Sequence, residues 1–387
     1  MNNLGKLLAF IILSPLLVPL IILAYLVHVI VALLIPVKFT KWFIFNVPGA
    51  SWQQGDLASD MIQPVHRSAP EISKLPASGE LIELDFRRDD SNDNPQNGRP
   101  IRALSYNIFL AQNLEGIIEE LASVKPPPDV IFLQEDNIYK LCDVEDGKSS
   151  TYHHAGAAIA RSLNMSCIFV NAHYRPNGCY GMSILSRFKL RNTVALKCPM
   201  QPWIVDQMAT WLKGERHFPY AEIGEGNNVV GLVSVHLPSV GKFKEKVDML
   251  DCLFEQLKAK TVDDRKHAIV PKIVGGDMNT APLFYRWILP FGSNDLYWSC
   301  VSETHLFRRF ILRSEYTDPF SDDDGTFQFP GGVEGKLDWM LFQNDYFEVQ
   351  SFEVQLRAIT SVTASDHRWI SATFTKQSAL SSKPTQD

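Results

Sequence analysis

The stretch Ile273–Asn279, which reads IVGGDMN, places an aspartate and an amide directly after a run of apolar residues. Ile273 and Val274 are typical of a buried β-strand. Asp277 and Asn279 follow two glycines, and an Asp-x-Asn sequence in that position is by itself more often a turn than a site. The stretch therefore becomes informative only if other strands also end in chemically competent residues.

Four further apolar runs share this pattern, because each meets a polar residue that is unusual in a protein core. They are Leu104–Asn107, which ends in an amide, Val130–Asp136, which ends in carboxylates, Val233–His236, which ends in an imidazole, and Ser365–His367, which opens the last strand. Mg²⁺ binds carboxylate oxygens and water, and phosphoester hydrolysis needs a base for water and a donor for the leaving oxygen. Strand ends gathered at one edge of a sheet could supply all of these groups.

Short apolar β-type runs alternate with helical patterns through most of the chain. Strands are predicted at 81–86, 101–105, 130–134, 168–171, 182–186, 207–212, 229–236, 269–274, 337–342, 347–354 and 369–374. Helices are predicted at 114–123, 154–163, 243–260 and 282–289. So many strands with so few crossover helices indicate an α/β domain of mixed, largely antiparallel sheets covered by helices.

The first fifty residues differ in composition from the rest of the chain. Residues 7–37 carry no formal charge and are bounded by Lys6 on one side and by Lys38 and Lys41 on the other. This predicts a membrane anchor at 1–50, because about 20 apolar residues already span a bilayer as a helix. Pro15 and Pro19 within the run allow either a single pass or a re-entrant hairpin. A cleaved signal peptide is the weaker alternative, since its apolar region is usually shorter. Orientation and organelle are not readable.

The other predicted segments are a polar linker at 51–98, a catalytic domain at 99–376 and a disordered tail at 377–387. Because the first fifty residues hold three lysines and no carboxylate, the remaining 337 residues carry a net charge of −9 instead of −6. Such a domain has no strong general attraction for nucleic-acid phosphates. Six scattered cysteines show no zinc-ligand spacing.

Seven short blocks that contain the polar strand ends occur in one order along the chain. They are Ser105-Tyr106-Asn107, Leu133-Gln134-Glu135, Gly181–Ser186, Ser234–Pro238, Gly276–Asn279, Leu337–Met340 and Ser365-Asp366-His367. In this order they resemble the endonuclease/exonuclease/phosphatase superfamily, and the resemblance spans residues 101–375. It implies a deoxyribonuclease I-like fold, which is a four-layer sandwich of two mixed, largely antiparallel β-sheets flanked by helices. The nearest type is a phosphodiesterase similar to neutral sphingomyelinase.

The resemblance also implies a metal centre and therefore a metal-dependent phosphoric ester hydrolase. Glu135 would be the principal ligand of Mg²⁺, or of Mn²⁺ in its place. Asn107 would lie beside it, and Asp366 would border the metal site. These oxygen donors agree with the ligands that hard divalent cations prefer.

The catalytic roles are implied in the same way. Asp277 would orient or deprotonate the attacking water, Asn279 would hold the scissile phosphate, and Asp338 would support His367. His236 occupies the position at which deoxyribonuclease I and the sphingomyelinases have a histidine, which makes a repair endonuclease less favoured. The two histidines are expected to flank the phosphate, one as acid and the other as base.

The substrate has two competing interpretations. The first is a membrane lipid, because an anchor at 7–37 would hold the site near a headgroup phosphodiester. The stretch Leu306–Arg313, aromatic and basic, could then dip into the interface, although an amphipathic helix packed on the domain is the simpler explanation. The second is a deoxyribonuclease-like endonuclease or exonuclease tethered to a membrane. A non-catalytic binding protein is disfavoured because every catalytic position holds a competent residue, and no protein partner can be inferred.

Overall fold

The computed structural model describes residues 70–377, except 73, 89–94, 96–98, 141–151, 176–177, 200–214, 240–242, 261–268, 281–302, 330–332 and 356–363. The chain divides into two units, residues 1–57 and 58–387, and the fold reported below belongs to the second. The predicted anchor at 1–50 and the predicted tail at 377–387, apart from Gln377, lie outside the described residues. Within those described ranges, no helix is long and apolar enough to cross a membrane.

The first sheet has β16, β17, β3, β4, β7, β6 and β2 in that order, with β5 paired to β4 and β1 paired to β5. Its strands are β1 (Glu71–Ile72), β2 (Leu81–Asp85), β3 (Ile101–Asn107), β4 (Val130–Lys140), β5 (Tyr152–His154), β6 (Ser166–Arg175), β7 (Gly178–Ser186), β16 (Phe347–Val354) and β17 (Ile370–Lys376). Strands β3 and β4 are parallel, and the other pairs are antiparallel.

The second sheet has β12, β15, β11, β10, β9 and β8 in that order, and β13 and β14 form a separate hairpin. Its strands are β8 (Arg191–Cys198), β9 (Arg216–Ile223), β10 (Val230–His236), β11 (Lys272–Asp277), β12 (Tyr316–Thr317) and β15 (Asp338–Gln343), and the hairpin consists of β13 (Phe327–Phe329) and β14 (Val333–Gly335). Only β10 and β11 run parallel among its described pairs. The prediction of mixed, largely antiparallel sheets is thus confirmed.

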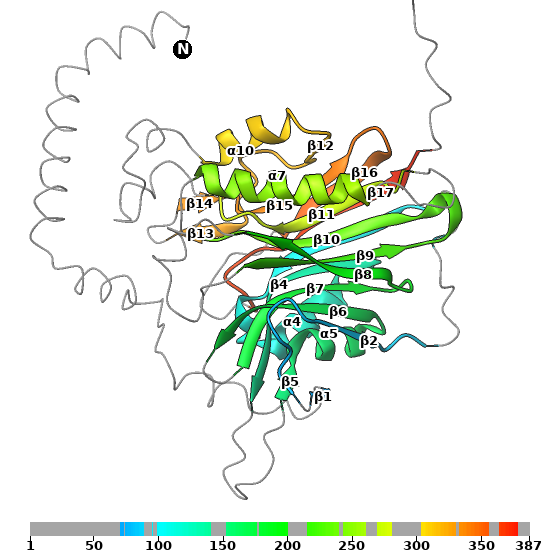
Figure 1. The fold of residues 1–387 in the computed structure, drawn as a ribbon, viewed down its shortest axis with the longest axis vertical. Helices are drawn as coiled ribbons and strands as arrows, with labels where there is room; N and C mark the ends of the chain where they lie inside the picture. The colour runs from blue at the N-terminus through cyan, green and yellow to red at the C-terminus, as the bar shows by residue number, and fades with distance from the viewer. Residues whose placement is uncertain are drawn as a thin grey trace, which may run out of the picture. The chain divides into compact units, whose positions relative to one another are not determined.

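Helices cover the outer faces of the two sheets (Figure 1). They are α4 (Leu114–Ser123), α5 (Ala155–Leu163), α7 (Phe243–Ala259) and α10 (Glu303–Ile311), with 3₁₀ turns η2 (Phe109–Ala111) and η4 (Gly226–Asn228). One apolar cluster joins α4 and α5 to β3 and β4, and another joins α7 and α10 to β10, β11 and β15. A third cluster, which includes Phe132, Leu232 and Ile273, lies between the sheets. Burial on both faces explains the nearly continuous apolar runs of the central strands.

Most predicted elements occur close to their predicted bounds. The helix at 114–123 and the strand at 347–354 match residue for residue, and Asn113 caps the helix by accepting a hydrogen bond from the backbone N–H of Gly116. The edge strand expected at 81–86 is β2. It lies inside the segment 51–98 that is predicted as a linker, and it pairs with β6. The elements predicted at 207–212 and 282–289 lie outside the described residues.

Most of the aromatic and basic stretch Leu306–Arg313 belongs to α10, which ends at Ile311 and packs on the domain. Phe307 and Ile311 are buried in the cluster shared with α7. Arg308 forms ion pairs with Asp318 and Asp322. These contacts support the packed-helix interpretation, although Leu312, directly after the helix, is 69% exposed.

The two glycines before Asp277 lie within β11, and the Asp-x-Asn sequence that follows leaves the strand through a turn, in which Oδ1 of Asp277 accepts a hydrogen bond from the backbone N–H of Asn279. A Cβ on Gly275 would stand 2.2 Å from Cδ2 of Phe132, a residue of the other sheet. A Cβ on Gly276 would stand 2.0 Å from the carbonyl oxygen of Val235 on the neighbouring strand. Glycine is therefore required for the close approach of the two sheets beneath the polar strand ends.

We expect Gly275→Ala to lower the free energy of unfolding by roughly 1–3 kcal/mol, because the added methyl overpacks the space between the sheets. Urea denaturation followed by circular dichroism measures the change. Phe132→Leu in the same chain should recover part of the loss, since it removes the clashing ring atom. Wild-type stability in Gly275→Ala would contradict this packing.

Candidate active site

Three of the predicted site residues lie in one row across the second sheet. The register pairs His236, the last residue of β10, with Asp277, the last residue of β11. It pairs Asp277 in turn with Asp338, the first residue of β15. Residues paired in register present their side chains to the same face of a sheet, so the hydrogen-bonding pattern alone brings these three groups together.

The first sheet contributes Asn107 and Glu135 at the same edge. Asn107 ends β3 and is paired with Gln134 of β4. Glu135 lies in a β-bulge and has φ +56°, a left-handed conformation that is uncommon outside glycine. The side-chain amide of Gln134 donates to the hydroxyl of Ser234 at 3.1 Å, so a buried hydrogen bond joins the two sheets beneath the site.

The buried carboxylate of Asp277 is the centre of the cluster. Its Oδ2 accepts a hydrogen bond from Nδ2 of Asn107 at 3.0 Å. The Nε2 atoms of His236 and His367 lie 3.5 and 3.9 Å from the same oxygen. Oε1 of Glu135 lies 3.9 Å from Nε2 of His236. The Nε2 atoms of both histidines therefore face the same carboxylate oxygen of Asp277.

His367 is held from behind by Asp338. Its Nδ1 lies 2.8 Å from Oδ2 of Asp338, which is fully buried. The backbone N–H of His367 donates to the hydroxyl of Ser365, and that hydroxyl donates to the carbonyl of Asn107 at 2.6 Å. The segment before β17 is thus tied to the end of β3, which fixes the orientation of the imidazole.

Asn279 is fixed by contacts with three different elements. Its backbone has φ +50°, and its N–H donates to Oδ1 of Asp277 at 2.7 Å. Its side-chain amide donates to the carbonyl of Leu237 at 2.8 Å. Nζ of Lys246, on α7, donates to its carbonyl at 2.6 Å. Lys246 is itself buried and paired with the buried Glu303 of α10, so two helices hold the loop that carries the amide.

Burial and neighbouring charges separate the properties of the two histidines. Burial, with Arg216 and His367 nearby, lowers the pKa of His236 well below its usual value. Burial alone would also lower the pKa of His367, but the carboxylates of Asp338, Asp277 and Asp366 raise it to about 10. At neutral pH the site therefore combines a neutral imidazole at 236 with an imidazolium at 367.

The carboxylates of the site are also perturbed. Burial, together with the neighbouring Asp338, raises the pKa of Asp277 to about 7 against the opposing effects of His367, Asn279 and Asn107. Burial also raises the pKa of Asp366. Such crowding of partly desolvated acids is typical of sites that act on a proton or hold a cation.

The structure brings together seven of the eight predicted site residues through direct contacts. Asp366 is the exception, because the hydrogen bond to its carboxylate comes from Ser365, although it lies within electrostatic range of His367. Oδ1 of Asn107 accepts from the backbone N–H of Phe109, so its amide nitrogen is the atom that faces the carboxylates. Asn107 therefore acts here as a hydrogen-bond donor between Asp277 and Glu135.

The donor set fits a hard divalent cation that keeps most of its water. Among the described residues, no three His, Cys, Asp or Glu side chains form a compact metal cage. Mg²⁺ usually binds through one or two carboxylates plus water and substrate phosphate, so a cage is not required. The carboxylate of Glu135 is 20% exposed, and Oδ1 of the buried Asp338 has no hydrogen-bond partner in the described structure.

Sequence reasoning missed the residues that support this cluster. Asp136 was grouped with Glu135 as a second strand-end carboxylate, but it faces away from the site. Its buried carboxylate accepts from the backbone N–H of Gly156 at 2.7 Å, contacts Nε2 of His154 at 2.8 Å and accepts from the hydroxyl of Ser183. This network fixes the bulge that turns Glu135 toward the site. The two-residue alternation of strands would assign Glu135 and Asp136 to the wrong faces, because the bulge at Glu135 breaks it.

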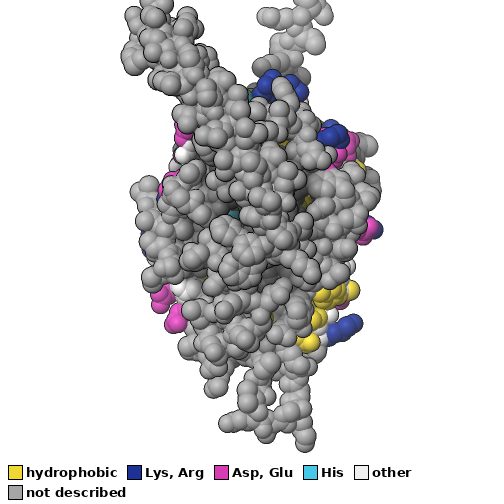
Figure 2. Space-filling view, turned by 90° about the vertical axis from the view of Figure 1, so that its left-hand side faces the viewer, with side chains coloured by type: hydrophobic (Ala, Val, Ile, Leu, Met, Phe, Trp, Pro, Cys, Tyr) yellow, Lys and Arg dark blue, Asp and Glu magenta, His cyan; other side chains and the backbone are white. Residues whose placement is uncertain are grey.

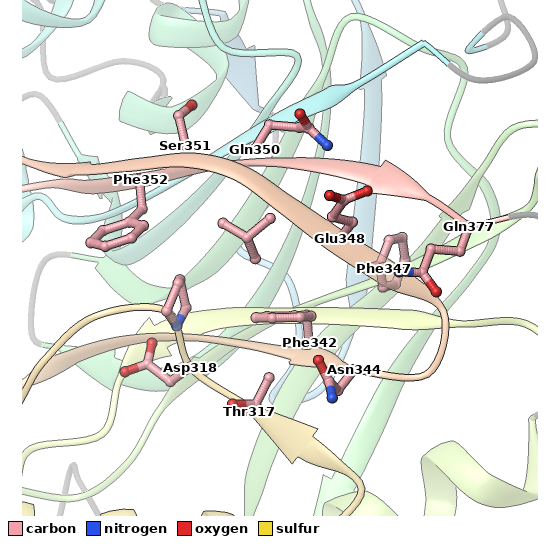
Figure 3. Close-up of a pocket in the computed structure, with 12 residues that line it drawn as sticks. Thr317, Asp318, Phe342, Asn344, Phe347, Glu348, Gln350, Ser351, Phe352 and Gln377 are labelled. Carbon is pink, nitrogen blue, oxygen red and sulfur yellow. The ribbon is translucent and has the colours of Figure 1, made fainter.

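The site lies at the sheet edge next to the β13–β14 hairpin, since Phe327 of β13 forms a β-bridge with His367. Figure 2 looks onto this side of the molecule, and a histidine side chain is visible near the centre of the face. A pocket of about 620 Å³ lies elsewhere, between β16 and the segment around β12 (Figure 3). Its lining includes Phe352 and Glu348 and none of the predicted site residues, so it is separate from the site.

We expect Asp338→Asn to shift the alkaline limb of the pH–rate profile to lower pH. A group with a raised pKa holds its proton up to that pKa, so a reaction that needs protonated His367 loses rate as pH rises toward about 10. Without the carboxylate, burial dominates and the proton is lost at lower pH. The measurement is kcat/KM against pH, with His236→Gln as the variant that lowers rate without moving this limb. An unmoved limb in Asp338→Asn would refute the coupling.

We expect Asp136→Asn to raise the concentration of divalent cation needed for half-maximal activity by roughly 10-fold or more, because support of a ligand typically contributes 10–100-fold. Asp129→Asn is the matched control. Asp129 is also buried and accepts a hydrogen bond from the backbone N–H of Arg102. It lies directly before β4, at the end of the strand away from Asp136. Both variants should lose stability, but only Asp136→Asn should change the metal requirement. Equal metal titrations for the two variants would show that the Asp136 network does not position Glu135.

The chain is similar to the human Nocturnin catalytic domain (16% identity, 77% of this chain and 97% of that chain, TM-score 0.46) and to a mannosyl-6-phosphatase from Bacteroides thetaiotaomicron (14%, 71% and 99%, 0.46). A search of curated proteins gave no significant match. The model of the Endonuclease/Exonuclease/phosphatase family matches residues 104–367, from β3 to His367. The chain belongs to the endonuclease/exonuclease/phosphatase family.

Proposed function

We propose that this protein is a hydrolase of phosphoric esters that depends on a divalent cation. The observation that carries the proposal is the arrangement around Asp277, where two histidines, one neutral and one protonated, face one buried carboxylate. Hydrolysis of a phosphoester needs a group that takes a proton from water and a group that stabilises the leaving oxygen. Both kinds of group are present within one cluster.

Glu135 and Asp366 are the carboxylates that would hold Mg²⁺ or Mn²⁺, and Asn107 would orient Glu135 through its amide. When bound, the cation would polarise the phosphoryl oxygens and offset their charge. The crowded carboxylates support this assignment, because a nearby cation would favour their charged forms against burial.

The remaining site residues act on the attacking water, the phosphate and the leaving oxygen. Asp277 orients the attacking water and accepts its proton, to which its raised pKa is suited. Asn279 places its amide where it can donate to a phosphoryl oxygen. His367, kept protonated by Asp338, donates to the leaving oxygen, while the neutral His236 hydrogen-bonds the phosphate opposite it. This division assigns the acid role to His367.

We further propose that the substrate is a phospholipid or sphingolipid whose headgroup phosphodiester is cleaved at a membrane surface. The support is the uncharged stretch at 7–37, which is long enough to anchor the chain, and the net charge of −9 beyond residue 50, which does not favour polyanionic DNA. An anchored enzyme meets a lipid substrate at a high effective concentration.

The direct test is turnover by the full chain in detergent on sphingomyelin, phosphatidylinositol phosphates and plasmid DNA, with and without Mg²⁺. We expect release of a phosphorylated headgroup, and we expect this release to stop when a chelator is added. Glu135→Gln should lower the rate of release by roughly 100-fold or more with the fold intact, because an amide cannot replace a carboxylate ligand. Full activity in chelator would contradict the metal assignment. Plasmid cleavage with no headgroup release would replace the lipid proposal with a nuclease.

Deletion of residues 1–50 separates anchoring from catalysis. We expect the deletion to lower activity on lipid vesicles far more than activity on a short-chain lipid analogue in solution, because only the surface concentration is lost. Equal losses on both substrates would mean that the segment does not deliver the site to a membrane.

A further inference from the structure

Arg216, the first residue of β9, is a buried cation that the proposed mechanism does not use. Its side chain is almost fully enclosed, since the residue is only 3% exposed. Two of its guanidinium nitrogens, Nε and Nη1, have no hydrogen-bond partner among the described residues. A guanidinium keeps its charge in proteins, so these two nitrogens are charged donors without an acceptor in the described part of the chain.

The topology places Arg216 at the edge that holds the active site. Strand β9 runs antiparallel to β10, with Tyr220 paired to Val233. The beginning of β9 therefore lies at the same edge as His236, the last residue of β10. Burial lowers the pKa of Arg216, while a hydrogen bond with the side chain of Tyr180 and the charge of Glu135 oppose this shift. Arg216 in turn lowers the pKa of His236.

A second buried arginine, Arg102, has the hydrogen-bond partners expected of an arginine with a structural role. Arg102 is 6% exposed and donates to the hydroxyl of Ser371, to the carbonyl of Pro126 and to the carboxylate of Glu353. Arg216 has no ion pair with any carboxylate in the described part of the chain. A buried charge whose Nε and Nη1 lack acceptors in the described structure is strongly unfavourable, so a structure that retains one at its active-site edge is arranged for an anion from outside.

We propose that Arg216 binds the non-bridging oxygens of the substrate's reacting phosphate. The inference rests on the proposed function, since it adds a phosphate-binding residue to the same site. The planar guanidinium presents parallel N–H groups that match two phosphate oxygens. It would stand beside His236 and Glu135 and offset the charge that hydrolysis builds on those oxygens. Arg216 would then be a catalytic residue, which the strand-end pattern could not reveal because it begins a strand.

The test compares Arg216→Met, Arg216→Lys and the control Lys272→Met. Lys272 is also a buried cation without a partner in the described structure, but it begins β11, at the opposite end from Asp277. With bis(p-nitrophenyl) phosphate and Mg²⁺, we expect Arg216→Met to lose about 100-fold or more in kcat/KM, as when one transition-state donor is removed. Arg216→Lys should lose less, and Lys272→Met should stay within about twofold of wild type.

Added guanidinium ions, at a concentration too low to unfold the protein, should restore part of the activity of Arg216→Met and have no such effect on the wild type. A purely structural arginine would not give this rescue. If Arg216→Met fails to fold, Arg216→Lys provides the same comparison with a charge retained. Wild-type kcat/KM in the folded variants would overturn the proposal.

Binding of inorganic phosphate, measured by calorimetry with Mg²⁺ present, separates this inference from the proposed function. We expect Arg216→Met to weaken phosphate binding by about 10-fold or more, which corresponds to loss of a charge-assisted hydrogen bond. Lys272→Met should bind phosphate as the wild type does. A wild type that hydrolyses no phosphoester but binds phosphate through Arg216 would refute the hydrolase and retain the inference. Equal phosphate affinity in Arg216→Met and wild type would overturn it.

Discussion

The register of three adjacent strands is the constraint on which the rest of the site depends. Parallel pairing of β10 with β11 and antiparallel pairing of β11 with β15 place His236, Asp277 and Asp338 side by side. A shift of one residue in either pair would turn one of them to the opposite face of the sheet. The absence of a side chain at Gly275 is part of the same constraint, because it lets Phe132 of the other sheet pack against β11.

The charges of the site follow from this arrangement. Asp338 contacts Nδ1 of His367, on the side of the ring away from Asp277, and so keeps that ring protonated. No carboxylate in the described part of the chain has this role for His236. Two chemically identical side chains thus acquire different charge states, neutral at His236 and positive at His367, through their neighbours. Around them, the buried Lys246–Glu303 pair holds the loop of Asn279 from the helical layer.

The polar residues at the strand ends could be predicted from the sequence, but the tertiary contacts that position them could not. Apolar runs that end in Asn107, His236 and Asp277 are local patterns, so both the strands and the polar positions could be predicted. The bulge at Glu135 depends on contacts of Asp136 with residues far along the chain, and no local pattern encodes it. Lys246 reads as an ordinary helix lysine, because its pairing with α10 depends on tertiary packing.

The most direct test of the central claim is anomalous diffraction from crystals of the protein grown with Mn²⁺. If the strand ends form one metal-dependent site, the principal Mn²⁺ peak lies within coordination distance of the carboxylate of Glu135, at the edge occupied by Asp277 and His367. The acidic stretch Asp322–Asp324 serves as an internal comparison, because it contains three consecutive carboxylates but no histidine. A peak only at that stretch, or no ordered Mn²⁺ near Glu135, would contradict the account.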